Sequence, residues 1–319
     1  MKLFRIVFTF VLFITSVSAQ SVWKPGKIEA KGDLVAVYFT SADRGWVAGD
    51  NGYLASTIDG GRTWTKYPLN TTEDINEIYF RNEKNGYLVA GRKMFITDDA
   101  GRTWRERVIY RAGDFRNGPP EFLSIRFADK KYGYLIGSLL NRDGEVVDSL
   151  LMRTDDEGNT WRRQIAPIKT ELFHLDFSGN SHGWIVGDKG VILATTDRGE
   201  TWRVQESGTP RALFCVDFVD DNEGWAVGGG GTILRTTDGG RSWDAVKSGH
   251  TQTLKRVDFA DQKNGWIVGF GGTILRSADR GQTWEKSQID NKGRIFGLYI
   301  TKRYGFAVGE NGATFEYSP

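Results

Sequence analysis

The chain has 319 residues, of which 42 are basic and 40 acidic, with three histidines and one cysteine. The near balance of charge argues against nucleic acid as the main partner, and the single thiol, Cys215, excludes an internal disulfide framework. Cys215 is interpreted as a small buried hydrophobe, and the histidines lack the spacing of metal ligands, so we expect no metal and no other cofactor.

Residues 1–19 have the features of a secretory signal peptide. Lys2 and Arg5 give a basic start, Leu3–Ile14 is mostly apolar, and Val17–Ala19 fits the small-residue cleavage rule. The apolar run is shorter than the ~20 residues of a membrane span, and a retained N-terminal anchor stays open as the alternative. Cleavage leaves 40 basic and 40 acidic residues. We therefore expect a secreted or periplasmic chain that starts at about Gln20, without stable membrane insertion.

The first predicted element of the mature chain is a short strand, Ser21–Lys24. Its Trp23 lies 41 residues before Trp64, which ends the first copy of a repeated pattern. Trp23 is thus in register with the tryptophans of that pattern. We expect this strand to become the outer strand of the last repeat, so that it closes a ring and leaves no open edge.

Two predicted strands precede the pattern in each repeat. The first is apolar, as in Leu213–Phe218 and Leu254–Phe259, which suits a sheet covered on both faces. The second begins with glycine and an aromatic residue, and in most copies ends with another glycine. Its seven copies are Gly45–Gly49, Gly86–Tyr87, Gly133–Gly137, Gly183–Gly187, Gly224–Gly228, Gly265–Gly269 and Gly305–Gly309.

The repeated pattern itself is [Ser/Thr]-x-Asp-x-Gly-x-[Thr/Ser]-Trp, and it occurs six times, mostly 41 residues apart. It resembles the Asp-box, the hairpin turn of sialidases and related propellers. The aspartate can accept hydrogen bonds from its own turn, the glycine supplies a positive φ, and the tryptophan can cover the hairpin. We interpret these residues as structural: Asp59, Asp99, Asp156, Asp197, Asp238, Asp279, Trp64, Trp104, Trp161, Trp202, Trp243 and Trp284.

A period near 40 with glycine and aromatic signatures is typical of a β-propeller. Seven glycine–aromatic strands and six Asp-boxes, with Trp23 in place of the seventh, predict an all-β fold. We expect a seven-bladed propeller of four-stranded antiparallel blades, ring closed by the N-terminal strand, with residues 20–319 as a single domain and a monomer in solution. The Gly228–Gly231 run is interpreted as a blade turn, since neither a helix nor a Lys-Ser/Thr pair follows it.

Two insertions interrupt the repeat, both at the third blade. Residues 111–122 lie before its inner strand, and residues 138–149 lie between its second and third strands. Strand parity in a four-stranded meander places both on the same face of the disc. Loops on a rigid scaffold commonly carry function, although neutral drift of exposed loops stays open. The predicted partner-binding residues are Arg111, Asp114, Phe115, Arg116, Asn141, Arg142 and Asp143.

A basic patch is the second candidate site. Three arginines occupy equivalent positions, three residues before an Asp-box aspartate, and a fourth lies on an inner strand at the position of His174. Solvated arginines that pair with nearby carboxylates are the alternative interpretation. The predicted patch consists of Arg153, Arg235, Arg276 and Arg256.

The combination of Gly-Trp-x-Val-Gly strands with Thr-Thr-Asp-x-Gly-x-Thr-Trp boxes carries a further resemblance. Over about residues 21–319, the chain looks like the photosystem II stability/assembly factor family of plants and cyanobacteria and its bacterial relatives. The resemblance implies a non-enzymatic, chaperone-like disc that binds proteins. We expect a scaffold or assembly chaperone with a membrane or secreted protein as its partner.

A glycan-binding or glycoside-hydrolase propeller of the sialidase type is the alternative. Sialidases carry an Arg-Ile-Pro motif before the first box, whereas the nearest string here is Arg294–Phe296, without proline and in the last blade. They are normally six-bladed. Asp50, Asp188 and Glu310 keep two-carboxylate hydrolysis open, but they lie in turns that repeat from blade to blade, so no catalytic residue is predicted.

Overall fold

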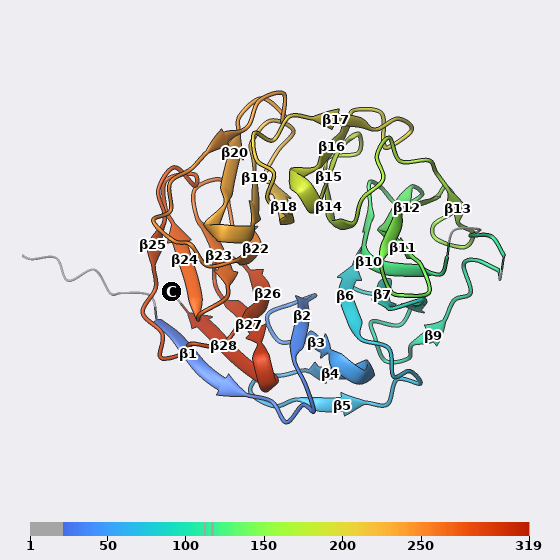
Figure 1. The fold of residues 1–319 in the computed structure, drawn as a ribbon. Coiled ribbons are helices and arrows are strands. Elements are labelled where there is room, and N and C mark those ends of the chain that lie inside the picture. The colour runs from blue at the N-terminus through green and yellow to red at the C-terminus, as the bar shows by residue number, and fades with distance from the viewer. Residues whose placement is uncertain (1–21, 112, 116–117, 319) are drawn as a thin grey trace, which may run out of the picture.

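A computed structural model describes residues 22–111, 113–115 and 118–318, which form a closed ring of sheets around a central channel (Figure 1). The predicted signal peptide, residues 1–19, lies outside the described residues, as do Ala112, Arg116 and Asn117. The described residues fold into seven antiparallel four-stranded sheets, so the prediction of a seven-bladed, all-β propeller is confirmed.

Each blade is a meander that runs from the channel outward. Blade one comprises β2 (Leu34–Phe39), β3 (Gly45–Gly49), β4 (Tyr53–Thr57) and β5 (Thr65–Tyr67). Blade two comprises β6 (Ile75–Phe80), β7 (Gly86–Ala90), β8 (Lys93–Thr97) and β9 (Arg105–Glu106). Blade three comprises β10 (Pro120–Phe127), β11 (Gly133–Leu140), β12 (Val146–Thr154) and β13 (Arg162–Arg163). Blade four comprises β14 (Leu172–Ser178), β15 (His182–Gly187), β16 (Ile192–Thr195) and β17 (Arg203–Gln205).

The remaining blades repeat this order. Blade five comprises β18 (Leu213–Phe218), β19 (Gly224–Gly228), β20 (Ile233–Thr236) and β21 (Asp244–Ala245). Blade six comprises β22 (Leu254–Phe259), β23 (Gly265–Gly269), β24 (Thr273–Ser277) and β25 (Glu285–Lys286). Blade seven comprises β26 (Ile295–Ile300), β27 (Gly305–Gly309), β28 (Ala313–Ser318) and the N-terminal β1 (Val22–Lys27).

The ring closes where β1 pairs with β28, as predicted from the register of Trp23. The two strands are antiparallel from Val22 opposite Ser318 to Lys27 opposite Ala313. Trp23 is 2% exposed, and its ring lies 5.3 Å from that of Tyr317. The first and last strands of the described chain therefore share one sheet, and blade seven has the same four strands as the others.

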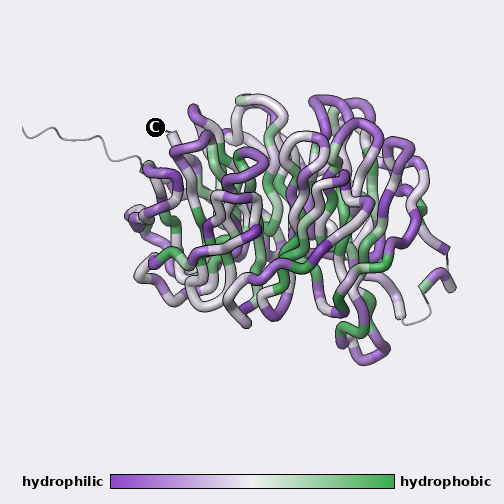
Figure 2. The backbone as a smooth tube through the Cα atoms, turned by 90° about the horizontal axis from the view of Figure 1, so that it is seen from above, coloured by the Kyte–Doolittle hydropathy of each residue, from purple (hydrophilic) through white to green (hydrophobic). Residues whose placement is uncertain are grey.

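The core lies between neighbouring blades rather than at one centre. The second strands are buried along their length because each blade is covered by the next, and Figure 2 shows hydrophilic turns on both rims of the disc. A repeated aromatic contact joins the blades. Trp184 of blade four stacks on Phe218 of blade five at 3.4 Å between centroids, and Trp243 meets Phe218 edge-on.

The Asp-box turns are held by their own side chains. In blade five, the Asp238 carboxylate accepts hydrogen bonds from the backbone N–H of Ser242 and the hydroxyls of Ser242 and Thr236, at 2.7–2.9 Å. Gly240 has a φ of +82°, and a side chain there would meet Gln205. In the first box, hydrogen bonds to Thr63 and Thr57 lower the pKa of Asp59 to about 2.

Strand order gives the disc two distinct faces. We call the face with the turns between second and third strands, and with the crossovers to the next blade, the top face. Among the described residues, the 3₁₀ helices η1 (Asp50–Gly52), η2 (Asp188–Gly190), η3 (Gly229–Gly231) and η4 (Glu310–Gly312) lie in these turns. The Asp-box turns form the bottom face. The Gly228–Gly231 run is thus the blade turn that the sequence predicted.

Candidate functional site

The inner strands bring seven equivalent positions together around the channel. Each of these strands has a register shift between a buried apolar residue and the residue two positions later, where the chain bulges. A cavity of about 150 Å³ inside the ring is lined by residues from all seven strands. Each blade therefore contributes one side chain at each equivalent position along the channel. The residue types differ between the middle of the channel and its mouth.

The middle of the channel is crossed by an ion network centred on Glu77 of β6. Its carboxylate lies 2.8 Å from an Arg126 guanidinium nitrogen and 3.1 Å from that of Arg256, on the far side of the ring. The other carboxylate oxygen accepts hydrogen bonds from the Ser124 hydroxyl and the Ile125 N–H, both at 2.8 Å. Glu77 thus links blades two, three and six through one buried side chain, which is 3% exposed.

The network fixes the charge states of its members. Burial alone would raise the pKa of Glu77, but Arg126, with His174 and Arg256, lowers it well below its ordinary value. Burial, with the nearby Arg256 charge, lowers the pKa of His174 to about 3, so this imidazole is neutral at pH 7. His174 contacts Arg126 at 3.1 Å through Nε2. The middle of the channel therefore contains buried charges that compensate one another, beside the cavity that Arg126, His174 and Arg256 help to line.

Three aspartates occupy equivalent positions below this network, on β14, β18 and β22. Each carboxylate accepts a hydrogen bond from a backbone N–H of the next inner strand: Asp176 from Phe218 at 2.9 Å, Asp217 from Phe259 at 3.0 Å and Asp258 from Ile300 at 2.9 Å. They therefore join blades four to seven. Burial raises the pKa of all three, that of Asp258 to about 7.

Asp258→Asn is expected to change how stability depends on pH. The pKa of Asp258 is raised from 3.8 to about 7 in the folded protein, so its contribution is present below pH 4 and is lost as the pH rises towards 7. Asparagine keeps an acceptor for Ile300 N–H without the charge. The variant should gain ~1–2 kcal/mol at pH 8, with the gain shrinking towards pH 4. Urea unfolding across this range measures it, and a profile parallel to wild type would contradict it.

Aromatic side chains surround the channel mouth on the top face. They come from the second position of the inner strands β14, β18 and β26 and from the turn after β23. The rings of Phe173 and Phe214 are 5.1 Å apart, and those of Phe270 and Phe296 are 5.9 Å apart. All four are half-buried, in blades four to seven. We call Phe173, Phe214, Phe270 and Phe296 the mouth collar.

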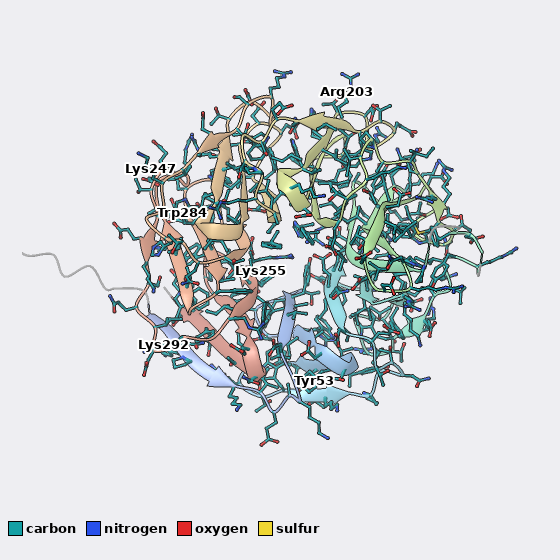
Figure 3. The ribbon with its side chains drawn as sticks, in the orientation of Figure 1. Tyr53, Arg203, Lys247, Lys255, Trp284 and Lys292 are labelled. Atoms are coloured by element: carbon teal, nitrogen blue, oxygen red, sulfur yellow. The ribbon has the colours of Figure 1, made fainter. Side chains whose placement is uncertain are left out.

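Two cations lie on the mouth collar. The Lys255 ammonium is 3.9 Å from the centre of the Phe214 ring, and Figure 3 places this residue at the centre of the disc. Burial lowers the pKa of Lys255 to about 8, and the described residues offer it no ion pair. Arg294 lies over Phe296 and Phe270 and also pairs with Asp33 and Glu310. The collar is thus apolar, with Lys255 as a cation that has no ion pair among the described residues and Arg294 as a cation paired with two carboxylates.

The two blade-three insertions contact each other on the top face. The Leu140 N–H donates a hydrogen bond to the Pro119 carbonyl at 3.0 Å. Within the second insertion, Asn141 organises the tip, because its side-chain oxygen Oδ1 accepts hydrogen bonds from the N–H groups of Asp143 and Glu145. Arg142 and Asp143 are exposed. These residues form one accessible surface at blade three.

The first insertion differs from the prediction in one residue. Phe115 is 9% exposed and packs with Tyr110 and Phe122 in the core between blades two and three, with the Arg163 guanidinium above it. Phe115 is therefore buried rather than presented to a partner, which corrects its place among the predicted partner-binding residues, because the loop folds back on its own apolar side chains. Arg111 and Asp114 close the loop through a 2.6 Å hydrogen bond, and Arg116 lies outside the described residues.

The four predicted basic-patch residues are not brought together. Arg256 lies in the channel, whereas Arg153, Arg235 and Arg276 lie on the third strands of blades three, five and six. Arg153 is 5% exposed and pairs with Glu200 of the next blade; Arg235 pairs with Glu223 at 2.5 Å. The patch is therefore corrected to separate arginines, which fill gaps between or within blades.

The thiol of Cys215 and the carboxylates in the top-face turns have structural roles. Burial raises the pKa of Cys215 to about 12, which suits a packed thiol. Asp50 and Glu310 in the top-face turns accept hydrogen bonds from the N–H groups of Asp33 and Arg294. Within the described part of the chain, no group of three or more His, Cys, Asp or Glu side chains is arranged to hold a metal ion. No helix there has the length and apolar character of a membrane span.

The sequence profile of one protein family matches most of the chain. It is described as photosynthesis system II assembly factor YCF48, and it matches residues 15–77, 117–209, 154–250, 201–294 and 242–311. Among curated relatives, the chloroplastic photosystem II stability/assembly factor HCF136 of Cyanidioschyzon merolae is 34% identical over 148 residues, which is 44% of this chain and 32% of the relative. The photosystem II assembly lipoprotein Ycf48 of Prochlorococcus marinus is 25% identical over 254 residues, covering 56% and 76%.

Solved structures share the fold at lower identity. The structure titled "YCF48 bound to D1 peptide" has a TM-score of 0.75 at 20% identity, covering 93% of this chain and 97% of that one. Virginiamycin B lyase of Staphylococcus aureus also has a TM-score of 0.75, at 12% identity, covering 94% and 100%. This chain spans about a third of HCF136 and 46% of Ycf48 from a Synechococcus strain. The same propeller thus occurs in assembly factors and in an enzyme.

Proposed function

Because this chain belongs to the photosynthesis system II assembly factor YCF48 family, we propose that it is a non-enzymatic propeller that binds a protein partner during assembly of an envelope or secreted complex. The names of its curated relatives place them in photosystem II assembly, and one solved relative holds a D1 peptide. By analogy, the partner here is an extracytoplasmic segment of a membrane or secreted protein.

The mouth collar is the observation that carries this proposal. It offers four half-buried aromatic rings and two cations on a rigid disc, at the face that also presents the blade-three insertions. Aromatic and arginine side chains dominate the binding energy of protein interfaces. We propose that an apolar partner segment with a carboxylate seats on the collar, and that Asn141, Arg142 and Asp143 contact the partner's periphery.

Non-enzymatic action is supported by how the acidic groups are used. Asp50 and Glu310 cap backbone N–H groups, and Glu77 is neutralised by two guanidinium groups. Neither arrangement leaves a carboxylic acid and a carboxylate facing a common cleft, as glycoside hydrolysis requires. An extracytoplasmic location is proposed from the predicted signal peptide and from relatives that are named as lipoproteins. We further propose that the disc acts as a monomer.

Replacing Phe214 and Phe296 together by serine is expected to reduce recovery of the partner from native envelope extract by ~tenfold or more. Loss of two aromatic anchors typically removes more than 2 kcal/mol of binding energy. The measurement is affinity capture with the mature protein as bait, followed by quantitative mass spectrometry.

Val204→Ser serves as the matched control, because Val204 is an exposed apolar residue on the outer strand β17. It should capture the partner as wild type does. Equal capture by the collar variant would remove the collar from the interface. Recovery of glycan in place of any protein would overturn the protein-binding function itself.

A further inference from the structure

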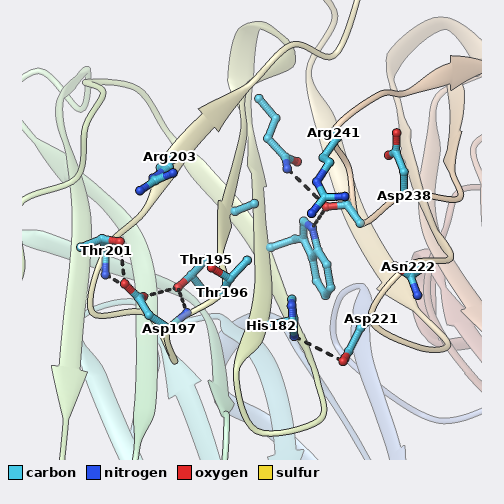
Figure 4. Close-up of a pocket in the computed structure, with 14 residues that line it drawn as sticks. His182, Thr195, Thr196, Asp197, Thr201, Arg203, Asp221, Asn222, Asp238 and Arg241 are labelled. Atoms are coloured by element: carbon cyan, nitrogen blue, oxygen red, sulfur yellow. Dashed lines mark hydrogen bonds and ion pairs between the residues drawn. The ribbon is translucent and has the colours of Figure 1, made fainter.

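A second recognition site is built into the bottom face, between blades four and five. One position on the third strand is equivalent in all seven blades, and in the six blades with an Asp-box it lies three residues before the aspartate. It is arginine in blades three, five and six, but alanine in blade four. A cavity of about 360 Å³ lies beside Ala194, and Figure 4 draws the residues that line it. Smaller cavities, of about 250 and 170 Å³, lie beside the equivalent Ser56 and Glu316.

The cavity is lined by charged groups of both signs, namely the carboxylates of Asp197, Asp221 and Asp238 and the guanidinium groups of Arg203 and Arg241. Asp197 and Asp238 belong to Asp-boxes, and their carboxylates are engaged by Thr201 and Ser242 of their own turns. Asp221 accepts a hydrogen bond from Ser178 and lies 3.3 Å from His182. Arg203 and Arg241 also line the cavity, and within the described part of the chain neither forms an ion pair. Figure 4 shows the Arg203 guanidinium above Asp197 and the Arg241 guanidinium above His182.

The wall of the cavity is rigid and mostly polar. The Trp184 indole stacks on Phe218 and donates a hydrogen bond to the Gly239 carbonyl at 3.0 Å. The Gln205 amide donates to the same carbonyl at 3.3 Å. Neutral side chains from both blades that can donate or accept hydrogen bonds also line the cavity, including Thr196 and Asn222. The polar groups are thus held in place by the blade contact itself.

We propose that this cavity binds an acidic sugar, a uronic acid, at the end or side of a glycan. Its carboxylate would pair with Arg241 and Arg203, which suit planar oxyanions, and its hydroxyls would meet the neutral polar groups. A compact cavity of this volume fits one or two sugar rings better than an extended peptide, which needs a continuous groove or sheet edge. The site lies on the bottom face, so it is independent of protein binding at the mouth collar.

The test measures binding of D-glucuronate, D-glucose and inorganic phosphate to the mature protein by saturation-transfer NMR and calorimetry. Glucuronate should bind at least ~tenfold more tightly than glucose, because only it gains charge-assisted hydrogen bonds. Arg241→Gln should weaken glucuronate binding by a similar factor. Absence of glucuronate binding, or equal affinity for glucose, would overturn the proposal, and phosphate binding as tight as glucuronate would reassign the cavity to anions in general.

Ala194→Arg places in blade four the residue that blades three, five and six already carry there. It should fold, as judged by its thermal unfolding, and lose glucuronate binding. Ser56→Arg makes the same change at the equivalent position in blade one and should bind glucuronate as wild type does. Retained binding by Ala194→Arg, or an equal loss in Ser56→Arg, would show that glucuronate does not occupy this cavity. Arg241→Gln keeps the assignment testable even if Ala194→Arg is unstable.

Discussion

Replacement of Trp23 by alanine is expected to lower the free energy of unfolding by ~3–5 kcal/mol, the cost of deleting a large aromatic ring from a packed core. Trp23 is 2% exposed and packs in the same apolar cluster as Trp266 and Tyr317. It also fixes β1 on β28, so the loss should loosen the strand that completes blade seven. Urea unfolding followed by tryptophan fluorescence and circular dichroism measures the change.

Lys24→Ala provides the control on the same strand. Lys24 is the next residue, is exposed, and lies opposite Glu316. Its replacement should change stability by no more than ~0.5 kcal/mol. A Trp23→Ala variant with the unfolding midpoint of Lys24→Ala would show that β1 does not hold the ring closed. Concentration-dependent association of Trp23→Ala alone would fit an exposed edge on β28.

Glu77→Gln is expected to cost a further large amount, ~3–5 kcal/mol, which is typical when one member of a buried ion pair is removed. The variant leaves Arg126 and Arg256 without the carboxylate that they share. A glutamine oxygen still accepts hydrogen bonds from Ser124 and Ile125, so the loss is mainly electrostatic. Urea unfolding at pH 7 gives the change in free energy.

Two comparisons separate this network from ordinary surface charge. Glu157→Gln removes the more exposed partner of Arg81 and should cost less than ~1 kcal/mol. Adding Arg256→Gln to Glu77→Gln should restore part of the stability, because it removes one uncompensated buried charge. If Arg256→Gln lowers the free energy of unfolding as much in the Glu77→Gln background as it does in the wild type, Glu77 and Arg256 are not coupled across the channel.

The architecture was predictable because each blade is specified locally. The second glycine of six of the seven glycine–aromatic strands illustrates this: a Cβ at Gly228 would approach the Ala212 carbonyl to 2.1 Å, and only blade two among the described blades has alanine, Ala90, at the equivalent position. Such constraints repeat with the blade, and counting them gives the blade number. The register of Trp23 with the Asp-box tryptophans likewise indicated the closing strand.

The candidate sites were less predictable because they depend on contacts between distant blades. Glu77 and Arg256 are 179 positions apart, and only the curvature of the closed ring brings them together. The signal available in the sequence was a charged residue inside an otherwise apolar inner strand, as in Leu175–Phe177 and Val216–Phe218. Phe115 failed for the opposite reason: its polar neighbours indicated a surface loop, while Tyr110 and Phe122 draw it into the core.

Comparison of equivalent positions across the blades explains where the bottom-face cavity lies. Arg153, Arg235 and Arg276 occupy equivalent positions in the sequence, and from these positions a basic binding patch is predicted at the arginines themselves. The structure gives Arg153 and Arg235 carboxylate partners, and it opens the largest of the cavities described here where the arginine is replaced by Ala194. In a repeat protein, the blade that departs from the consensus is the one to test for recognition.

Docking of a partner at the channel mouth is tested most directly by site-specific photo-crosslinking in native envelope extract. A benzophenone amino acid at position 214 of the mouth collar should crosslink to one defined protein, and the same group at position 204 on the outer strand β17 should not. Crosslinking to that protein with equal yield from both positions, or from position 204 alone, would contradict partner binding at the collar.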